Sequence, residues 1–540
     1  MNARLALKTL TAAMAAALAA SPAANAITLS GYSEGDANTV TLRIGGSSAH
    51  DKGLLSLMRL TAAGGAEICQ ENTLHHYKVG SNDNIYACTA GAQSGVAGSK
   101  LVVIKKSSGG SGTGVATVVK SGTVNLDDGT TVNSTYLDPS NATLQAGTGF
   151  TTTSKAAEGA LSAYTELSIG SSAGLTAAST TDVGISDAEP AVSRRLFNPD
   201  LKATELNAMA VKGISGVIFG VPVTRNVYQR LQALQFPTTS KCNPAGTGYG
   251  SITAAVDASN AANSEECMPS LTRDQVQGLY IGAIDWSSIA SANAGSSANL
   301  TEVSGTGTTL NSSTVYLERR VSSSGTQRSY DIYFLGQGCL SGAPTFRTAA
   351  GEPGVVVENS SGSTIPANLN SHNTAGRGAI GVLTSESKPA LADGWRFVKL
   401  NGYAPTVLNV VKGTYDLFYE STLQYRNTTV NGLSSLAAGT NGANEKKLAD
   451  AIATNLGKPS VVSFLNTSFD QFFGRAGLVA NAVSQAASAP VPPFTTGAAG
   501  SGVATDVYDK PVATSTRGTS GTPNACLFPV KVNLSQPAAQ

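Results

Sequence analysis

The segment 319–326 sets two arginines beside a run of hydroxyl-bearing residues. It reads Arg-Arg-Val-Ser-Ser-Ser-Gly-Thr, after the strand-like run 314–317 and before periodic apolar residues at 330–334. This pattern predicts a strand, a tight loop and the start of a helix. The free N–H groups and the positive dipole end of a helix start bind anions, and Arg320 adds a guanidinium fork that matches a tetrahedral oxyanion. The segment therefore predicts an anion site.

Further segments place similar residue types at the ends of expected strands. Residues 42–49 read Leu-Arg-Ile-Gly-Gly-Ser-Ser-Ala, residues 169–174 read Ile-Gly-Ser-Ser-Ala-Gly, and residues 182–188 read Asp-Val-Gly-Ile-Ser-Asp-Ala. Asp187 would be a lone carboxylate among hydroxyl and N–H donors. Such a carboxylate accepts the proton that phosphate carries and sulfate lacks. The alternative role for Asp187 is a helix N-cap, and the two roles are compatible.

In chain order, these segments resemble the periplasmic phosphate-binding protein of bacterial ABC phosphate importers. The motifs of that family are a Gly-x-Gly-Ala-Thr-Phe start, an Ile-Gly-Ser-Ser-Gly-Gly turn, an Asp-Phe-Gly-Ala-Ser-Asp-Ala strand end and an Arg-x-Asp-Gly-Ser-Gly-Thr loop. A predicted helix at 271–286 and a Gly-Ala-Ile-Gly-Val strand at 378–382 also fit. The resemblance implies these phosphate-binding residues: Ser48, Ala49, Ser171, Asp187, Arg320, Ser324, Gly325 and Thr326.

The chain departs from the family pattern at several positions. Ser48 and Ala49 stand where the family has Thr and Phe, which removes part of the wall of the site. Ser322 replaces an Asp that would hold Arg320, and Ser323 replaces a Gly. The turn at 169–174 also comes much later than in the family, so we expect an insertion at about 60–160. These departures bear on which anion binds more than on whether one binds.

A second strand-and-loop segment lies inside the expected insertion. The apolar run 101–104 is followed by Lys105, Lys106 and the loop Ser-Ser-Gly-Gly-Ser-Gly-Thr-Gly at 107–114. One interpretation is another nest of N–H groups at the same anion site. The interpretation we favour is a flexible loop, because Ser/Gly tracts usually are.

The expected fold is α/β. Residues 39–44 alternate apolar and polar and lead through two glycines into a helix-like pattern at 54–58, which is typical of a βα unit in an open sheet. The 540 residues exceed the ~250–300 that one core usually holds. The resemblance implies a two-lobed periplasmic binding protein fold of type II, each lobe an open sheet flanked by helices. We divide the chain into a first lobe at 27–212, a second lobe at 213–381 that begins with a Gly-rich crossing strand, and a segment 382–540 that completes the first lobe and forms the C-terminal tail.

The N-terminus is typical of an exported protein. Residues 1–26 carry Arg4 and Lys8, an apolar stretch and an Ala-Asn-Ala cleavage site, which predicts a signal peptide. We expect the periplasm of a Gram-negative type of cell as the destination, with release from the cell as the alternative.

The chain has 36 Lys and Arg against 35 Asp and Glu, so no basic field favours nucleic acid or an anionic membrane. No later run reaches the ~18 apolar residues of a membrane span. We expect a monomer that binds phosphate or a related oxyanion, with ABC transporter membrane subunits as partners and with no cofactor or metal.

Six cysteines in an exported chain favour disulfides. The simplest pairs are the local ones, Cys69 with Cys88 and Cys242 with Cys267, although the sequence alone allows others. This choice leaves Cys339 with Cys526, a pair that would tie the tail across the cleft between the lobes.

Two other functions are compatible with parts of the sequence. Gly170, Ser172 and Gly174 satisfy the Gly-x-Ser-x-Gly pattern of a serine hydrolase, with His372 in the right chain order, but residues 175–181 make a poor helix for a nucleophile elbow. The adjacent His75 and His76 have no spaced metal-ligand partner, so we expect a solvated loop pair. The low share of charged residues, 13%, also suits a secreted or surface structural protein with a vestigial pocket. A binding protein that is not an enzyme remains the prediction.

Overall fold

The computed structural model describes residues 28–127, 129–256, 260–290, 298–303, 308–336, 355–438, 441–480 and 511–513, together with a short strand pair at 515–516 and 530–531. The predicted signal peptide at 1–26 lies outside the described residues. So do Cys339 and Cys526, whose pairing stays a prediction.

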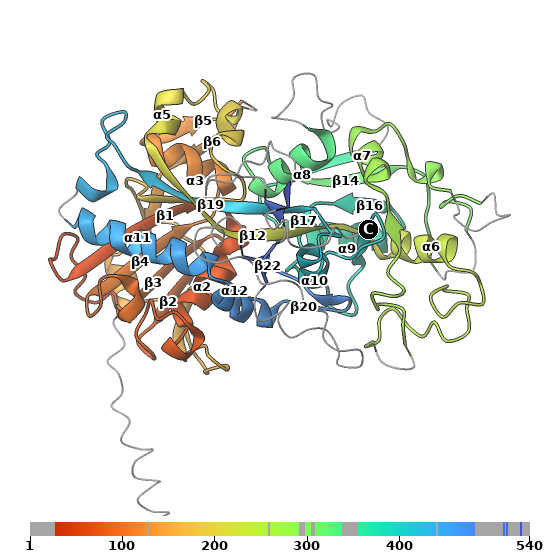
Figure 1. Cartoon of the computed structure of the whole chain (residues 1–540), viewed down its shortest axis with the longest axis horizontal. Helices are drawn as coiled ribbons and strands as arrows, with labels where there is room; N and C mark the ends of the chain where they lie inside the picture. The colour runs from red at the N-terminus through yellow and green to blue at the C-terminus, as the bar shows by residue number, and fades with distance from the viewer. Residues whose placement is uncertain are drawn as a thin grey trace, which may run out of the picture.

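The N-terminal part of the chain forms an open sheet covered by helices (Figure 1). Its centre is parallel: β1 (Thr39–Gly46) pairs with β4 (Lys100–Lys106) on one side and β11 (Val183–Ser186) on the other. β19 (Phe418–Arg426) then pairs antiparallel with β11. These strands are almost wholly buried, as expected of a sheet covered on both faces. The covering helices are α2 (Asp51–Arg59), α3 (Gly110–Val119), α11 (Gly442–Gly457) and α12 (Pro459–Leu465).

Four further strands extend this sheet beyond β4. β3 (Asp83–Thr89) pairs antiparallel with β4, and β2 (His75–Val79) pairs antiparallel with β3. β9 (Tyr164–Ile169) and β8 (Thr151–Lys155) complete the edge. The Ser/Gly loop after β4 leads directly into α3, so our preference for a flexible loop at 107–114 was wrong.

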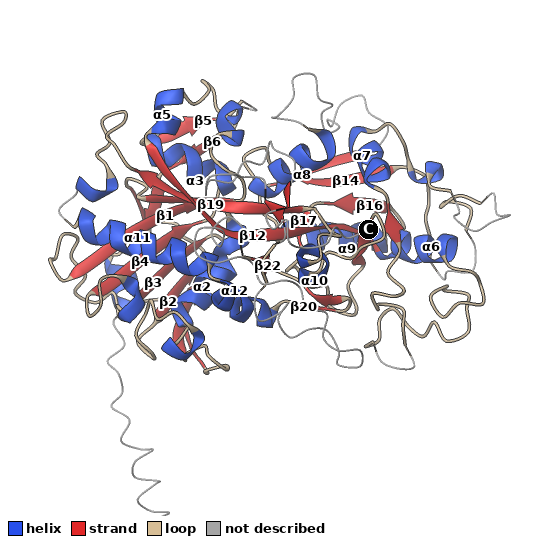
Figure 2. Cartoon of the chain, in the orientation of Figure 1, coloured by secondary structure: helices blue, strands red, loops and turns tan. Residues whose placement is uncertain are grey.

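β12 (Met209–Thr224) carries the chain from the first sheet into a second one. Its first part pairs with β19, and its last residues pair with β16 (Gly378–Gly381) and β18 (Trp395–Leu400). The second sheet continues from β16 to β14 (Val315–Arg320) and β15 (Val355–Asn359), all parallel. Its helices are α6 (Arg225–Gln235), α7 (Arg273–Ile281), α8 (Gly325–Leu335), α9 (Thr364–Thr374) and α10 (Val407–Val411). Figure 2 shows helices and strands mixed in both halves, which confirms the predicted two-lobed α/β class. The lobe boundaries drawn from the sequence stay a prediction.

Local signals explain where the helices near the site begin and end. Ser324 caps α8 by accepting a hydrogen bond from the Gln327 N–H, and Gly336 ends the helix in the left-handed conformation. Thr272 and Gln275 form a capping box at the start of α7, and Gly282 ends it, so the helix predicted at 271–286 is shorter. Near the C-terminal end of the described chain lie three short strands, β20 (Asp470–Gln471), β21 (Gly474–Arg475) and β22 (Leu478–Val479).

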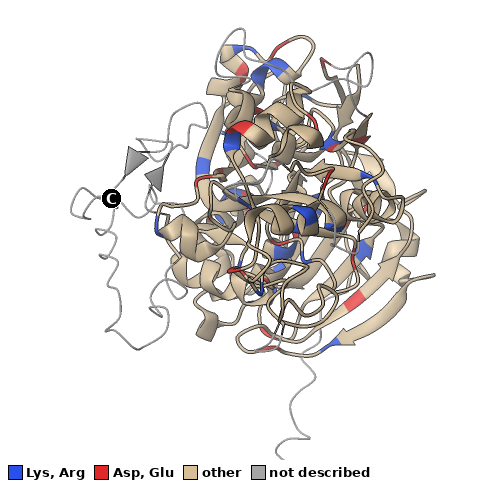
Figure 3. Cartoon of the chain, turned by 90° about the vertical axis from the view of Figure 1, so that its right-hand side faces the viewer, with Lys and Arg blue, Asp and Glu red and all other residues tan. Residues whose placement is uncertain are grey.

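Two disulfides confirm the predicted local pairs, Cys69 with Cys88 and Cys242 with Cys267. Within the described ranges, no helix is both long and apolar enough to cross a membrane. Lys and Arg lie interspersed with Asp and Glu along the ribbon (Figure 3).

Candidate functional site

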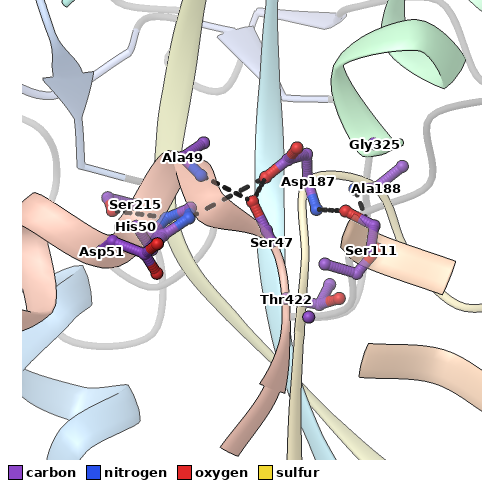
Figure 4. A network of polar contacts seen from close by, with 12 residues as sticks. Ser47, Ala49, His50, Asp51, Ser111, Asp187, Ala188, Ser215, Gly325 and Thr422 are labelled. Atoms are coloured by element: carbon purple, nitrogen blue, oxygen red, sulfur yellow. Dashed lines mark hydrogen bonds and ion pairs between the residues drawn. The ribbon is translucent and has the colours of Figure 1, made fainter. Parts of the chain in front are cut away.

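Asp187 lies at the centre of a buried polar network at the carboxyl ends of β1 and β11 (Figure 4). It is 2% exposed, Ser47 Oγ donates a short hydrogen bond to its Oδ1, and its backbone N–H donates to Ser111 Oγ at 3.1 Å. Burial raises the pKa of Asp187 to about 6, although the Ser47 hydrogen bond and the charge of Arg320 oppose this rise. The carboxyl group is therefore an acceptor at neutral pH and takes up a proton in mildly acidic solution.

Arg320 brings a positive charge from the second lobe to this network. It ends β14 and is 5% exposed. Its Nε and Nη2 donate to the carbonyl oxygens of Asn359 and Ser360, each at 3.2 Å. These carbonyl oxygens hold the guanidinium in place. Position 322, where an aspartate was expected to do this, is a serine. Burial lowers the pKa of Arg320 to about 10 and the charge of Asp187 opposes this, so the side chain is charged at neutral pH.

Two helix N-termini meet beside Asp187, one from each lobe. Gly325 is the first residue of α8, and a Cβ built on it would lie 2.5 Å from Asp187 Oδ2. The backbone can come this close because the residue has no side chain. α3 starts at Gly110 in the first lobe, and the Gly112 N–H donates to Ser323 O at 2.9 Å. The positive ends of both helices are therefore near the same point, where an anion is favoured.

A cavity of about 470 Å³ opens between the lobes beside this network. Ser48 and Ala49, which follow β1, line it on the first-lobe side, and Arg320 and Thr326 line it on the second-lobe side. The cavity provides space for a ligand that touches both lobes.

The structure brings seven of the eight predicted residues together. Ser48, Ala49, Arg320 and Thr326 line the cavity, and Asp187, Ser324 and Gly325 are buried next to it.

Asp187 does not act as the helix N-cap that was the alternative role for it. Its carboxylate accepts a hydrogen bond from Ser47. The next described helix starts at Val192, and its cap residue is Ala191.

Ser171 does not join the other predicted residues. It follows β9, is exposed, and its hydroxyl accepts a hydrogen bond from the Ala173 N–H at 3.2 Å. Ser111, in the first turn of α3, contacts Asp187 instead. The physical reason is sheet order: β4 pairs parallel with β1, so its carboxyl end meets the site, whereas β9 lies beyond β2 near the edge.

Sequence reasoning missed several polar residues of the site, above all Lys105. This side chain is fully buried, and its Nζ donates to Gly46 O at 2.9 Å and to Ser107 Oγ at 2.7 Å. The Nζ also lies 3.2 Å from Asp51 Oδ1. Ser47 and Ser111 were missed as well. The sequence feature that could have revealed Lys105 is the pair of lysines directly after the apolar run 101–104.

The serine hydrolase motif does not form a nucleophile elbow. Ser172 lies between β9 and β10 (Thr176–Ala178), in a strand–loop–strand unit with no helix after the serine. His372 lies on α9 in the second lobe, where its Nε2 is 2.8 Å from Glu318 Oε1.

The histidine pair is placed differently from our prediction. His75 and His76 belong to β2, and His76 is 3% exposed with Nε2 at 2.9 Å from Asn84 Oδ1, so the expected solvated loop pair was wrong. Among the residues that the structure describes, no group of three or more His, Cys, Asp or Glu could hold a metal ion.

No protein-family model matches the chain, and no curated protein matches it. Several solved structures match part of the chain. An ABC-type phosphate transport receptor from Vibrio cholerae has 16% sequence identity and a TM-score of 0.26, with 51% of this chain and 77% of that chain covered. A putative phosphate ABC transporter substrate-binding protein from Clostridium perfringens, solved with bound phosphate, has 15% identity and a TM-score of 0.28, with 56% and 85% covered. PstS from Borrelia burgdorferi has 14% identity and a TM-score of 0.27, with 58% and 87% covered. Values this low say nothing of the ligand.

Proposed function

We propose that this protein is an exported solute-binding protein that captures phosphate or a similar tetrahedral oxyanion between its two lobes. The observation that carries the proposal is the buried charge of Arg320, which faces Asp187 where the N-termini of α3 and α8 meet. Among the described residues, Nε and Nη2 of Arg320 donate to carbonyl oxygens, whereas Nη1 has no hydrogen bond. Because Arg320 lines the cavity, this nitrogen is available to an anion there.

The proposed contacts divide between the lobes. Arg320, Thr326 and the first N–H groups of α8 would donate to the anion from the second lobe, and Ser48 and the Ala49 backbone would donate from the first. Asp187 would accept the proton of a protonated oxyanion. Ser171 has no part in this proposal because of its exposed position.

The proposal extends to the compartment of the protein and its transport partner. The signal-like N-terminus and the two disulfides suit an oxidising compartment, for which we propose the periplasm. The protein would then deliver the captured anion to the membrane subunits of an ABC importer. No catalytic role is proposed.

Arg320→Ala tests the function, with Arg319→Ala as the matched control. The Arg319 side chain alternates to the other face of β14 and pairs with Glu358 at 2.9 Å. We expect Arg320→Ala to weaken phosphate binding by about a hundredfold or more, because it removes the charged partner of a buried anion. Arg319→Ala should bind like the wild type. Equilibrium dialysis with labelled phosphate measures both. A wild type that binds no oxyanion, or an Arg320→Ala variant with unchanged affinity, would contradict the proposal.

A further inference from the structure

The interlobe cavity is larger than an inorganic oxyanion requires. Its volume of about 470 Å³ lies within the range of pockets that hold organic ligands. Arg320 and Thr326 account for only one part of its lining. Much of the rest of the first-lobe wall comes from β2, β3, the turn between them and β9, through His76, Lys78, Asn82, Asn84, Tyr86 and Glu166.

This wall is polar and held in place by the sheet. His76 lies opposite Tyr86 in the antiparallel register of β2 and β3, and their rings stack with centroids 4.9 Å apart. His76 Nε2 contacts Asn84 Oδ1 at 2.9 Å, whereas Nδ1 makes no hydrogen bond and lies 3.6 Å from Glu166 Oε2. A buried ring nitrogen without a hydrogen-bond partner calls for a ligand group or an ordered water.

Several side chains that line the cavity lack a hydrogen bond within the described ranges. They include Lys78, Asn82 and Glu386. Burial raises the pKa of Glu386 to about 7, so near neutral pH its carboxyl group both donates and accepts. An ammonium group, an amide and a carboxyl group around one cavity suit a ligand rich in hydroxyl groups, because a hydroxyl also both donates and accepts.

We propose, on the basis of the anion-binding function above, that the ligand is a phosphate monoester of a polyol or sugar. Its phosphate group lies at Arg320 and Asp187, and its hydroxylated part lies against the wall that β2, β3 and β9 provide. The strands added to the first sheet by the insertion thus form a second subsite that an inorganic anion does not reach.

Calorimetric titration of the purified mature protein tests this inference. The probes are inorganic phosphate, glycerol phosphate, a hexose 6-phosphate and glycerol. We expect at least one ester to bind about tenfold or more tightly than inorganic phosphate, with no binding of glycerol. A Lys78→Ala/Asn82→Ala variant should weaken ester binding by about tenfold and leave the affinity for inorganic phosphate within about twofold. Lys241→Ala, in an exposed ion pair with Glu266, is the control and should change neither affinity.

The outcomes separate the two proposals. Inorganic phosphate that binds as tightly as every ester overturns the monoester inference and leaves the oxyanion function intact. Equal losses for ester and phosphate in the double variant overturn the second subsite. Absence of binding by all phosphate probes overturns both the inference and the proposed function on which it rests.

Discussion

At the scale of single residues, the site depends on two buried groups of opposite charge. Burial raises the pKa of Asp187 and lowers that of Arg320, and each charge opposes the shift of the other. Both groups therefore keep their charge at neutral pH. Under the proposed function, an anion that enters would be attracted by Arg320 and repelled by Asp187 unless it brings a proton that the carboxylate can accept. Selection of a protonated oxyanion would then require both residues.

Asp187→Asn should reduce discrimination between phosphate and sulfate. The amide cannot act as an anionic acceptor, and its NH₂ group can donate to a fully deprotonated oxyanion. Lowering the pH should reduce the discrimination of the wild type between phosphate and sulfate in the same way. The pKa is raised to about 6, so the protonated carboxyl dominates below that pH, and sulfate should bind better at pH 5 than at pH 8. Competition titrations at the two pH values measure this.

Asp182→Asn is the matched control for that experiment. Asp182 comes just before β11, as Asp187 comes just after it, and burial raises its pKa to about 6 as well. Its carboxylate accepts from the Arg43 N–H at 2.8 Å, away from Arg320. The variant should keep the selectivity of the wild type. A wild type that prefers sulfate at pH 8 would refute the role of Asp187.

At the scale of elements, the sequence predicted the strand, loop and helix that carry Arg320, but not which other segments of the chain lie next to them. β14, the tight loop and α8 were predictable because the apolar run, the capping Ser324 and the helical periodicity are adjacent in the chain. The segments 107–114 and 169–174 are both rich in Ser and Gly, so composition could not show which one reaches Asp187. The long-range parallel pairing of β4 with β1 decides it, and no local pattern encodes that pairing.

Gly325→Ala tests the close approach of α8 to the first lobe. The added Cβ would clash with Ser111 Oγ and lie 2.5 Å from Asp187 Oδ2, so the start of α8 and the carboxylate must move apart. We expect a loss of about 1 to 3 kcal/mol in the free energy of unfolding and weaker anion binding. Gly170→Ala, where the Cβ would meet nothing within 4 Å, is the control. Denaturant unfolding and calorimetry measure the two effects. Wild-type affinity in Gly325→Ala would show that the contact of α8 with Asp187 does not shape the site.

At the scale of the whole molecule, the two lobes share a small number of connections. β12 runs through both sheets, and β19 pairs with β12 and β11 in the first (Figure 1). The Gly-rich run at 213–223 predicted this crossing strand. The sequence did not predict that β2 and β3 would line the cavity, because their pairing with β9 and β4 sets their position. Across the cleft, the Gly112 N–H to Ser323 O hydrogen bond links the start of α3 to the loop before α8.

This interlobe hydrogen bond leads to a prediction about motion. The Gly112 N–H belongs to the first turn of α3, so it has no partner within its own helix and depends on the opposite lobe. Parting of the lobes exposes it to solvent exchange, and a ligand that binds both lobes reduces the time spent apart. Saturating ligand should therefore slow amide hydrogen exchange at 107–114 and 319–326 together, with little change in α11. Arg320→Ala should show no such slowing under the same conditions. Protection confined to one of the two segments would mean that the ligand binds a single lobe.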